Sequence, residues 1–363
     1  MSQASMVFDV VIAGAGIIGS SIAWRLAQCG LRVGLFDSRT MGGGASWAGA
    51  GMLAPGGEAG DDRDFAQQLL SSLRAWPDFI RELSEESGER IDYVACGALD
   101  FAFSDDELAK LGRRAARNES FGVRVEKLTV SEMRSIARDL PEGLAGAYHY
   151  PEDAIVDPRD VMRALRRVCD RCGVTVLEGC AVRMIDTDGK GVQATTEDGQ
   201  VCAEAAVLSA GAWSGEIEIK GAALPSGPDS YPVKGYLVAH ELAMGTLGPI
   251  RRREGTYVLQ RSSGRVLSGS TEERSGFDPS FSEDMAADLE KRAAALVPAL
   301  RNRTRVDAWI GFRPGTSAPR PAEGRCGDTA LWLAYGHYRN GILLAPQTAE
   351  NISRDIIASL GRR

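Results

Sequence analysis

Residues 9–19 read DVVIAGAGIIG, an apolar run that leads directly into a G-x-G-x-x-G turn. The segment Val7–Ala13 predicts a parallel strand that is covered on both faces. Gly14 allows a tight turn, Gly16 lets the backbone approach a pyrophosphate, and Gly19 lets the following helix touch the strand. This stretch therefore predicts the strand, turn and helix start with which a dinucleotide-binding unit begins.

The next segment supplies the other parts of such a unit. Ile22, Leu26 and Cys29 have the spacing of the inward face of a helix. Leu31–Phe36 then predicts a second strand that ends at Asp37. A carboxylate there accepts hydrogen bonds from both ribose hydroxyls, and no arginine replaces it to bind a 2′-phosphate. A coincidental glycine turn is the alternative, but it would not explain the strand, helix and acid together.

The chain has 363 residues and a formal net charge of −7. Its length favours two joined domains, and its acidity argues against a nucleic-acid partner. The seven cysteines are scattered, and the lone C-x-x-C of Cys169 and Cys172 lacks a second ligand pair, so we expect neither a disulfide framework nor a metal site. No run approaches the ~20 apolar residues of a membrane span, and the first apolar segment is a strand, so we expect a cytoplasmic protein.

A glycine-rich segment follows the predicted unit, because residues 42–55 read GGGASWAGAGMLAP. Its small residues would let the backbone wrap closely around a cofactor. Trp47, Met52 and Leu53 give it apolar anchors, which a floppy glycine linker would not need. The glycine turn alone does not separate NAD from FAD, and we interpret this second segment as a loop that wraps the cofactor.

Close to the C-terminus, residues 336–346 read GHYRNGILLAP. The apolar run Ala330–Tyr335 before them predicts a buried strand, and Thr348–Leu360 after them has helical spacing. A strand, a polar turn and a helix start together form an anion-binding arrangement, because free N–H groups and the helix dipole point outward there. Two such sites indicate a cofactor that is held from both termini, as in FAD-dependent amine oxidases.

The middle of the chain alternates helical and strand patterns. Helices are expected at 64–86, 105–120, 157–172 and 282–297, strands at 174–177, 182–185, 193–196, 205–208 and 305–312, a turn at 188–191, and β-alternation from 231 to about 270. The pattern predicts an α/β fold, in which a Rossmann-like FAD-binding domain is interrupted discontinuously by a β-rich α+β substrate domain. The expected bounds are 1–85, 150–225 and 305–363 for the FAD-binding domain, and 86–149 and 226–304 for the substrate-binding domain.

Several motifs occur in an order that is typical of one enzyme family. After the N-terminal turn come AGMLAP at 50–55, AGAWS at 210–214, GFRPGT at 311–316 and the C-terminal GHYRNGILLAP. Together they resemble the FAD-dependent D-amino acid oxidase superfamily, and specifically its glycine oxidase branch, which is linked to thiamine thiazole synthesis. The resemblance covers essentially the whole chain. It implies oxidative deamination of glycine, sarcosine, small D-amino acids or small amines, with O2 as acceptor and an oxo acid, ammonia and H2O2 as products.

The resemblance also implies which residues bind the cofactor and the substrate. FAD is expected to be non-covalent, because Cys326 lies before the last strand, a poor position for reaching the flavin ring. The resemblance matches Tyr257 and Arg313 to the positions that bind the substrate carboxylate, with Arg339 nearby. Glu272 is a further candidate for substrate contact, which its place on the strand suggests and the resemblance does not. The implied FAD-binding residues are Gly14, Gly16, Ile17, Ile18, Gly19, Asp37, Ser38, Ser46, Ala48, Ala50, Gly51, Met52, Val182, Gly211, Trp213, Arg313, His337, Arg339, Asn340, Gly341 and Ile342.

The chemistry of amino-acid oxidation accounts for these residue types. The substrate carboxylate must be fixed so that the Cα–H points at the flavin N5, and the planar fork of Arg313 suits a carboxylate better than a lysine does. The Tyr257 hydroxyl adds a donor. No protein base is required once the amine is neutral, so positioning carries most of the catalysis. The alternatives are a surface salt bridge for Arg313, core packing for Tyr257, a structural ion pair for Arg339, and a packed turn residue for His337.

Glu272 departs from the family pattern, which has an apolar residue at this position. Alternation along 265–271 would put Glu272 on the same side as Val266, Ser268 and Ser270, and close to the bound amino acid if that side faces the flavin. The alternative is that the strand end twists away and leaves Glu272 in solvent. Two other functions are also open here: a D-amino acid dehydrogenase that uses an electron carrier, and a non-catalytic dinucleotide-binding module. A homo-oligomer is one candidate for the assembly.

Overall fold

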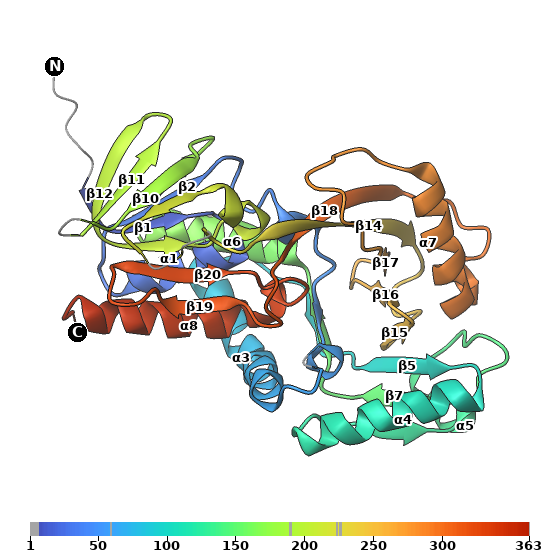
Figure 1. Cartoon of the computed structure of the whole chain (residues 1–363). Coiled ribbons are helices and arrows are strands. Elements are labelled where there is room, and N and C mark those ends of the chain that lie inside the picture. The colour runs from blue at the N-terminus through green and yellow to red at the C-terminus, as the bar shows by residue number, and fades with distance from the viewer. Residues whose placement is uncertain (1–6, 59, 189–190, 223, 225–226, 363) are drawn as a thin grey trace.

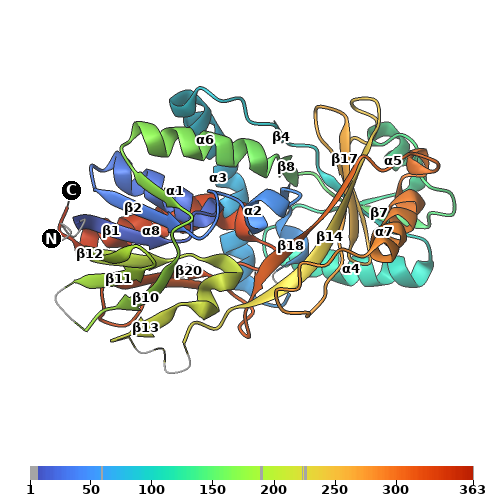
Figure 2. The same cartoon turned by 90° about the horizontal axis from the view of Figure 1, so that it is seen from above.

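The computed structural model of the protein describes residues 7–362 except 59, 189–190, 223 and 225–226. Two lobes lie side by side, and each is built around its own large β-sheet (Figure 1). The long strands β14 (Tyr231–Glu241) and β18 (Asp307–Gly315) pair antiparallel and run between the lobes (Figure 2). This pair therefore joins the two halves of the protein.

The first lobe is organised around five parallel strands of a nine-stranded sheet. At its centre, β1 (Val7–Ala13) pairs with β2 (Val33–Asp37), which pairs with β9 (Thr175–Glu178). On the other side, β1 pairs with β12 (Gly199–Leu208), which pairs with β20 (Leu331–Tyr335). Because parallel strands end at the same edge of a sheet, the segments that follow these strands meet there. The remaining strands are β10 (Val182–Asp186), β11 (Val192–Thr196), β13 (Glu218–Lys220) and β19 (Ala322–Arg325).

Four helices pack with this sheet and with one another. They are α1 (Ile17–Gln28), α3 (Arg63–Ser87), α6 (Pro158–Arg171) and α8 (Gly341–Ser359). Trp24, Trp76 and Trp332 are fully buried in the core that they share. The Trp76 Nε1–H and the Ser72 hydroxyl both donate to the Leu343 carbonyl, at 2.9 and 2.7 Å. These bonds fix α3 against the start of α8.

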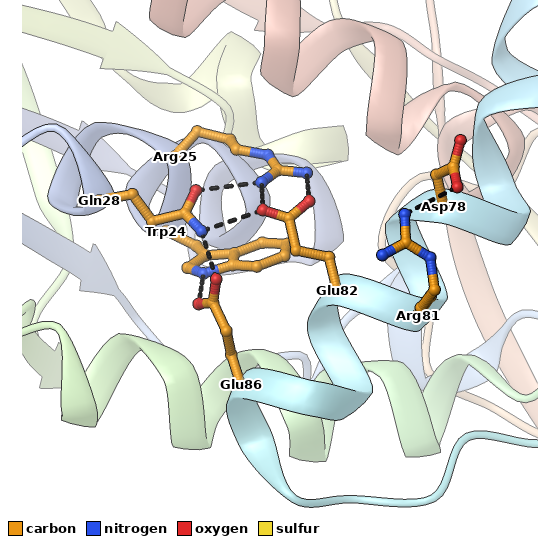
Figure 3. Close-up of polar contacts among 7 residues, drawn as sticks. All are labelled: Trp24, Arg25, Gln28, Asp78, Arg81, Glu82 and Glu86. Atoms are coloured by element: carbon orange, nitrogen blue, oxygen red, sulfur yellow. Dashed lines mark hydrogen bonds and ion pairs between the residues drawn. The ribbon is translucent and has the colours of Figure 1, made fainter.

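A polar cluster fixes the other end of α3 against α1 (Figure 3). The Arg25 guanidinium forms two bonds to the Glu82 carboxylate, at 2.5 and 2.8 Å, and lies 4.1 Å from the Trp24 ring. The Gln28 amide donates to both Glu82 and Glu86. The Trp24 Nε1–H donates to Glu86 Oε2 at 2.8 Å, so the buried indole keeps a partner where its edge reaches the surface. The helix that follows the glycine turn is thereby held rigidly.

The second lobe contains an eight-stranded sheet whose two faces have different neighbours. Tyr257 and Leu267 lie on the face that packs against Ala48 and Ala50 of the glycine-rich segment. Val266, on the other face, packs against α7 (Glu283–Leu296). The other elements of this lobe are β5 (Ala98–Ala102), β6 (Glu126–Leu128), β7 (Gly146–Tyr150), β15 (Ile250–Arg253), β16 (Thr256–Gln260), β17 (Arg265–Gly269), α4 (Asp105–Ser120) and α5 (Val130–Ile136).

The glycine-rich segment lies between the two lobes. It forms α2 (Ala45–Ala48) and β3 (Met52–Leu53), and β3 enters a small sheet with β8 (Ala154–Val156) and β4 (Tyr93–Val94). The second lobe holds it through its backbone, since the Trp309 Nε1–H donates to the Ala48 carbonyl at 3.0 Å and the Arg261 guanidinium donates to the Ala50 carbonyl. Leu53 is buried as predicted, whereas Trp47 is 43% exposed and packs edge-on against Trp309.

The α/β fold is confirmed, and three local predictions are wrong. Cys29 is exposed, because it caps the C-terminus of α1 instead of continuing its inward face. β18 continues through Gly315, so Arg313 lies within a strand and not in a turn after it. α8 begins at Gly341, earlier than predicted, although Pro346 lacks a helical N–H donor.

The turn at 188–191 and the domain bounds are not settled by the described residues. The turn at 188–191 lies partly outside the described residues. The domain bounds stay a prediction, but β18, which they assign to the FAD-binding domain, is hydrogen-bonded into the sheet of the second lobe. Among the described residues, no helix has the length and apolar character needed to cross a membrane.

Candidate active site

One elongated cavity runs from the β1–α1 turn of the first lobe to the sheet of the second lobe. It brings together the N-terminal turn, the glycine-rich segment, the segment after β12 and the C-terminal motif, all of which the sequence singles out. Of the predicted site residues, Gly19 and Glu272 are the two that do not line it. Those that do are Gly14, Gly16, Ile17, Ile18, Asp37, Ser38, Ser46, Ala48, Ala50, Gly51, Met52, Val182, Gly211, Trp213, Tyr257, Arg313, His337, Arg339, Asn340, Gly341 and Ile342.

At the β1–α1 turn, two glycines are required by close backbone contacts. Gly14 has a φ of 109°, and a Cβ there would lie 2.4 Å from the Ser209 carbonyl oxygen. A Cβ on Gly19 would lie 2.0 Å from the Gly14 carbonyl oxygen, which agrees with its predicted role in helix–strand contact. The Ile17 N–H at the start of α1 donates to Ser46 Oγ at 2.9 Å, so the glycine-rich segment is bonded to this turn.

Asp37 lies at the end of β2, where a ribose-binding carboxylate is expected. Its Oδ2 accepts the Ala15 N–H at 2.8 Å, and its Oδ1 accepts the Arg39 N–H at 2.9 Å. Each oxygen keeps a lone pair for a ribose hydroxyl, since a carboxylate has about four acceptor sites. Burial raises the pKa of Asp37, and the two backbone N–H groups oppose that rise. The Arg39 guanidinium lies 4.3 Å from the ring of Trp213, which closes this part of the cavity.

Further along the cavity, the wall consists largely of backbone. A Cβ on Gly49 would lie 2.6 Å from Ile342 Cδ1, and one on Gly51 would lie 1.8 Å from the Val156 carbonyl oxygen. Gly51 also has a φ of 76°, which favours glycine. Segments this close leave a smooth, narrow wall that suits a planar ring system. With the free carboxylate acceptors of Asp37 at the other end, the cavity fits FAD.

His337 is a neutral, packed residue of the cavity wall. It is 3% exposed, and its Nε2 lies 3.2 Å from Thr348 Oγ1. The Thr348 hydroxyl donates to Glu323 at 2.9 Å, so its oxygen accepts the His337 Nε2–H. Burial lowers the pKa of His337 to about 4. This environment favours the packed turn residue over a base that takes up a proton near neutral pH.

Arg313 and Tyr257 meet at the far end of the cavity. Arg313 Nη2 donates to Ser270 Oγ at 2.7 Å, and Nη1 donates to the Thr271 carbonyl at 3.1 Å. Both partners are uncharged, so the positive charge is left for an anionic ligand. Tyr257 is 8% exposed, and burial raises the pKa of its hydroxyl, which stays a protonated donor. The absence of a side chain on Gly269 leaves room for that hydroxyl, since a Cβ there would lie 2.3 Å from it.

Arg339 also lines this end but has acidic partners. Its Nη1 lies 3.2 Å from Glu272 Oε1, and its Nε lies 3.7 Å from Glu58 Oε1. Burial lowers the pKa of Arg339, but the two carboxylates outweigh burial and raise it. The structural ion pair that the sequence leaves as the alternative to substrate contact by Arg339 is therefore present.

Of the two orientations that the sequence leaves open for Glu272, the one toward the bound amino acid is not found, and the exposed one is. The face of β17 that carries Val266 and Ser268 packs toward α7, away from the cavity. β17 ends at Gly269, after which Ser270 lines the cavity and the alternation no longer applies. Glu272 is 48% exposed and contacts the site through its ion pair with Arg339.

Many residues that line the cavity are not predicted from the sequence, and Arg39, Glu58 and Ser270 are the ones whose contacts bear on the site's chemistry. Arg39 covers Trp213, Glu58 pairs with Arg339, and Ser270 bonds to Arg313. Arg39 lies two residues after Asp37, and its position after the second strand was an available signal. Glu58 and Ser270 lie in irregular segments, where no periodicity indicates their direction.

The site combines a Rossmann-like sheet, which presents a glycine turn and a carboxylate, with a second lobe that presents an arginine and a tyrosine. This combination defines a two-lobed flavin-dependent oxidoreductase. Residues 9–354 match the family described as FAD dependent oxidoreductase (DAO), and the chain belongs to this family. The glycine oxidase of Geobacillus kaustophilus (strain HTA426) is 34% identical over 344 residues, which are 94% of this chain and 90% of that protein.

Solved structures agree with this assignment. The crystal structure of glycine oxidase from Geobacillus kaustophilus has a TM-score of 0.92 and 33% identity, and covers 98% of this chain and 95% of that chain. The crystal structure of iminodiacetate oxidase (IdaA) from Chelativorans sp. BNC1 has a TM-score of 0.86 and 26% identity, and covers 96% of this chain and 95% of that chain. The resemblance seen in the motifs, FAD as the cofactor and the class of FAD-dependent amino acid oxidase are confirmed.

Proposed function

We propose that the protein oxidatively deaminates glycine and other small amino acids or amines, such as sarcosine and small D-amino acids, with O2 as acceptor. The products are an oxo acid, ammonia (an alkylamine from sarcosine) and H2O2. The observation that carries the proposal is Arg313, whose partners are the uncharged oxygens of Ser270 and Thr271, beside the buried hydroxyl of Tyr257. A protein that only bound a dinucleotide would have no need of this carboxylate-binding pair.

The residues act mainly by positioning the substrate. The Arg313 guanidinium would bind the substrate carboxylate through two N–H groups, and the Tyr257 hydroxyl would donate a further bond. With the carboxylate fixed at this end, the Cα–H is directed along the cavity toward the part that Ala48, Gly51 and Met52 line. Bound FAD supplies the hydride acceptor there. We assign FAD to the predicted cofactor-binding residues on the same basis.

The substrate amine must lose its proton before it is oxidised. His337 donates through Nε2 to Thr348, and burial lowers its pKa to about 4, so it is unsuited to this proton transfer. The amine would therefore reach the site neutral, or lose its proton to water. The limiting rate is accordingly expected to rise with pH as the neutral amine becomes more abundant.

The electron acceptor and the substrate can be tested together. The FAD-loaded protein is mixed with glycine, sarcosine, D-alanine, L-alanine and methylamine, and both oxygen uptake and peroxide release are measured. We expect peroxide from glycine or sarcosine and little turnover of methylamine, which lacks a carboxylate. Turnover with an artificial electron carrier but not with oxygen would indicate a dehydrogenase instead. No turnover with either acceptor would contradict the proposal. The cytoplasmic location and the homo-oligomer stay predictions.

A further inference from the structure

Arg339 lies where three pockets meet. It lines the main cavity, a surface pocket beneath α7 and a surface pocket beside α4. The pocket beneath α7 also contains Glu272 and the ion pair of Asp288 with Arg292. The pocket beside α4 also contains Glu58 and basic residues: Lys110 and three arginines that are each paired with an acid, namely Arg114, Arg252 and Arg253. A substituent that extends from the bound amino acid toward either outer pocket would therefore pass Arg339.

The two arginines at this end of the cavity differ in their partners. Arg313 bonds to the Ser270 hydroxyl and the Thr271 carbonyl, and keeps a full positive charge for a ligand. Arg339 has two carboxylates, Glu272 at 3.2 Å and Glu58 at 3.7 Å. The group of Arg339 and its two acids thus carries a net charge of −1. One carboxylate has a binding site here, and a second one would meet a neutralised arginine.

We propose that Glu272, together with Glu58, makes this enzyme selective for amino acids with a single carboxylate, by occupying Arg339 and repelling a second carboxylate on the substrate. The inference rests on the proposed function and adds a specificity-determining residue to it. A dicarboxylate would have to displace Glu272 from Arg339 and lie beside Glu58. Neutral or cationic substituents face no such barrier, so specificity comes from repulsion of the wrong substrate.

The expected change in substrate preference is limited by the solvent exposure of the Glu272–Arg339 ion pair. Glu272 is 48% exposed and Arg339 is 30% exposed, so solvent and salt screen the pair. We therefore expect removal of the Glu272 charge to change the preference between mono- and dicarboxylates by about tenfold, and not by many orders of magnitude. The change should appear mainly in KM, because the second carboxylate lies away from the reacting Cα–H bond.

A matched pair of substrates isolates the second carboxylate. N-Ethylglycine and iminodiacetate carry N-substituents of similar length, but iminodiacetate has the additional carboxylate. The FAD-loaded wild type, Glu272→Gln and Asp288→Asn are compared by kcat/KM for both amines. Asp288→Asn is the control, because Asp288 lines the same pocket but pairs with Arg292 at 3.0 Å and not with Arg339.

The inference predicts that wild type prefers N-ethylglycine, and that Glu272→Gln raises the ratio for iminodiacetate over N-ethylglycine about tenfold. Asp288→Asn should change this ratio less than twofold, and high salt should raise it in wild type more than in Glu272→Gln. An unchanged ratio in Glu272→Gln, or a wild type that prefers iminodiacetate, would overturn the inference while glycine oxidation stands. If wild type oxidises none of these amines, the proposed function itself fails.

Discussion

Replacing Arg313 with lysine keeps a positive charge in the cavity but removes the planar fork that suits a carboxylate. Two guanidinium nitrogens already bond to Ser270 Oγ at 2.7 Å and to the Thr271 carbonyl at 3.1 Å. A guanidinium has enough N–H groups to keep both contacts and still present donors to a substrate, whereas an ammonium presents its donors from a single point. Lysine therefore loses either the contacts to the chain or one bond to the carboxylate.

The expected loss corresponds to that one bond. A hydrogen bond to a charged group contributes about 1.5–3 kcal/mol, which is about a 10- to 150-fold change in kcat/KM. Initial rates of peroxide release from glycine and sarcosine measure this change, with the active-enzyme concentration taken from the flavin absorbance. FAD should stay bound, because the lysine variant leaves the other predicted FAD-binding residues unchanged. For amines without a carboxylate, wild type and variant should be equally slow.

Arg325→Lys provides the matched control. Arg325 also donates to backbone carbonyl oxygens, including that of Thr329 at 2.7 Å, but it does not line the main cavity. Its substitution should leave glycine kinetics within twofold of wild type. If Arg313→Lys oxidises glycine as well as wild type does, Arg313 does not bind the substrate carboxylate and the reasoning is refuted.

Substitutions at four other residues test separate parts of the structure. Asp37→Ala should weaken FAD binding by about 1.5–3 kcal/mol. The control Asp9→Asn loses bonds to Arg32 outside the cavity and should leave the FAD Kd unchanged. Equal FAD Kd values for the two variants would show that Asp37 does not bind the ribose. Glu86→Ala should lower the free energy of unfolding by about 1–3 kcal/mol, and with it Tm, because it leaves the Trp24 indole N–H without its partner. The control Asp78→Ala breaks an exposed ion pair in the same region (Figure 3) and should leave Tm unchanged. The pKa of His337 is about 4 in the folded protein and 6.5 in an ordinary histidine, so the unfolded chain binds the proton first and the protein becomes less stable as pH falls. The difference in Tm between wild type and His337→Gln should therefore shrink from pH 7.5 to pH 5. A constant difference would contradict the lowered pKa. Denaturation should release intact FAD from wild type and from Cys326→Ser alike, because Cys326 is buried in the core beside β20 and does not line the cavity; flavin that stays with the precipitated chain would disprove non-covalent binding.

Elements whose ends carry local signals could be predicted closely from the sequence. The bounds of α4 agree with the prediction, because Ser104 caps the helix by accepting the Glu107 N–H. α6 begins at Pro158 after the cap Asp157. The glycine turn also depends on nearby structure, because Gly14 and Gly19 are required by close contacts within one strand–helix unit and with its neighbouring strand.

Features that depend on distant segments could not be predicted in this way. Glu272 pairs with Arg339, which lies 67 residues away, and its direction is set by where β17 ends. Ser270 and Thr271 bond to Arg313 across the sheet, a contact that no periodicity indicates. The early start of α8 was hidden by Pro346, which lacks a helical N–H donor, and side chains of α3 hold the first turn of α8 through the Leu343 carbonyl. In each case the local pattern was outweighed by tertiary contacts.

The proposed function requires that this cavity holds FAD and directs the Cα–H bond of a carboxylate-bearing amine at it. Mixing the FAD-loaded protein with glycine or sarcosine in the absence of oxygen tests this claim most directly, because reduction of the bound flavin is observed without any assumption about the acceptor. The account predicts that the absorbance of oxidised flavin is lost with both amino acids, returns when oxygen is admitted, and persists when methylamine is added instead. Flavin that stays oxidised with every carboxylate-bearing amine, or is reduced equally by methylamine, would contradict it.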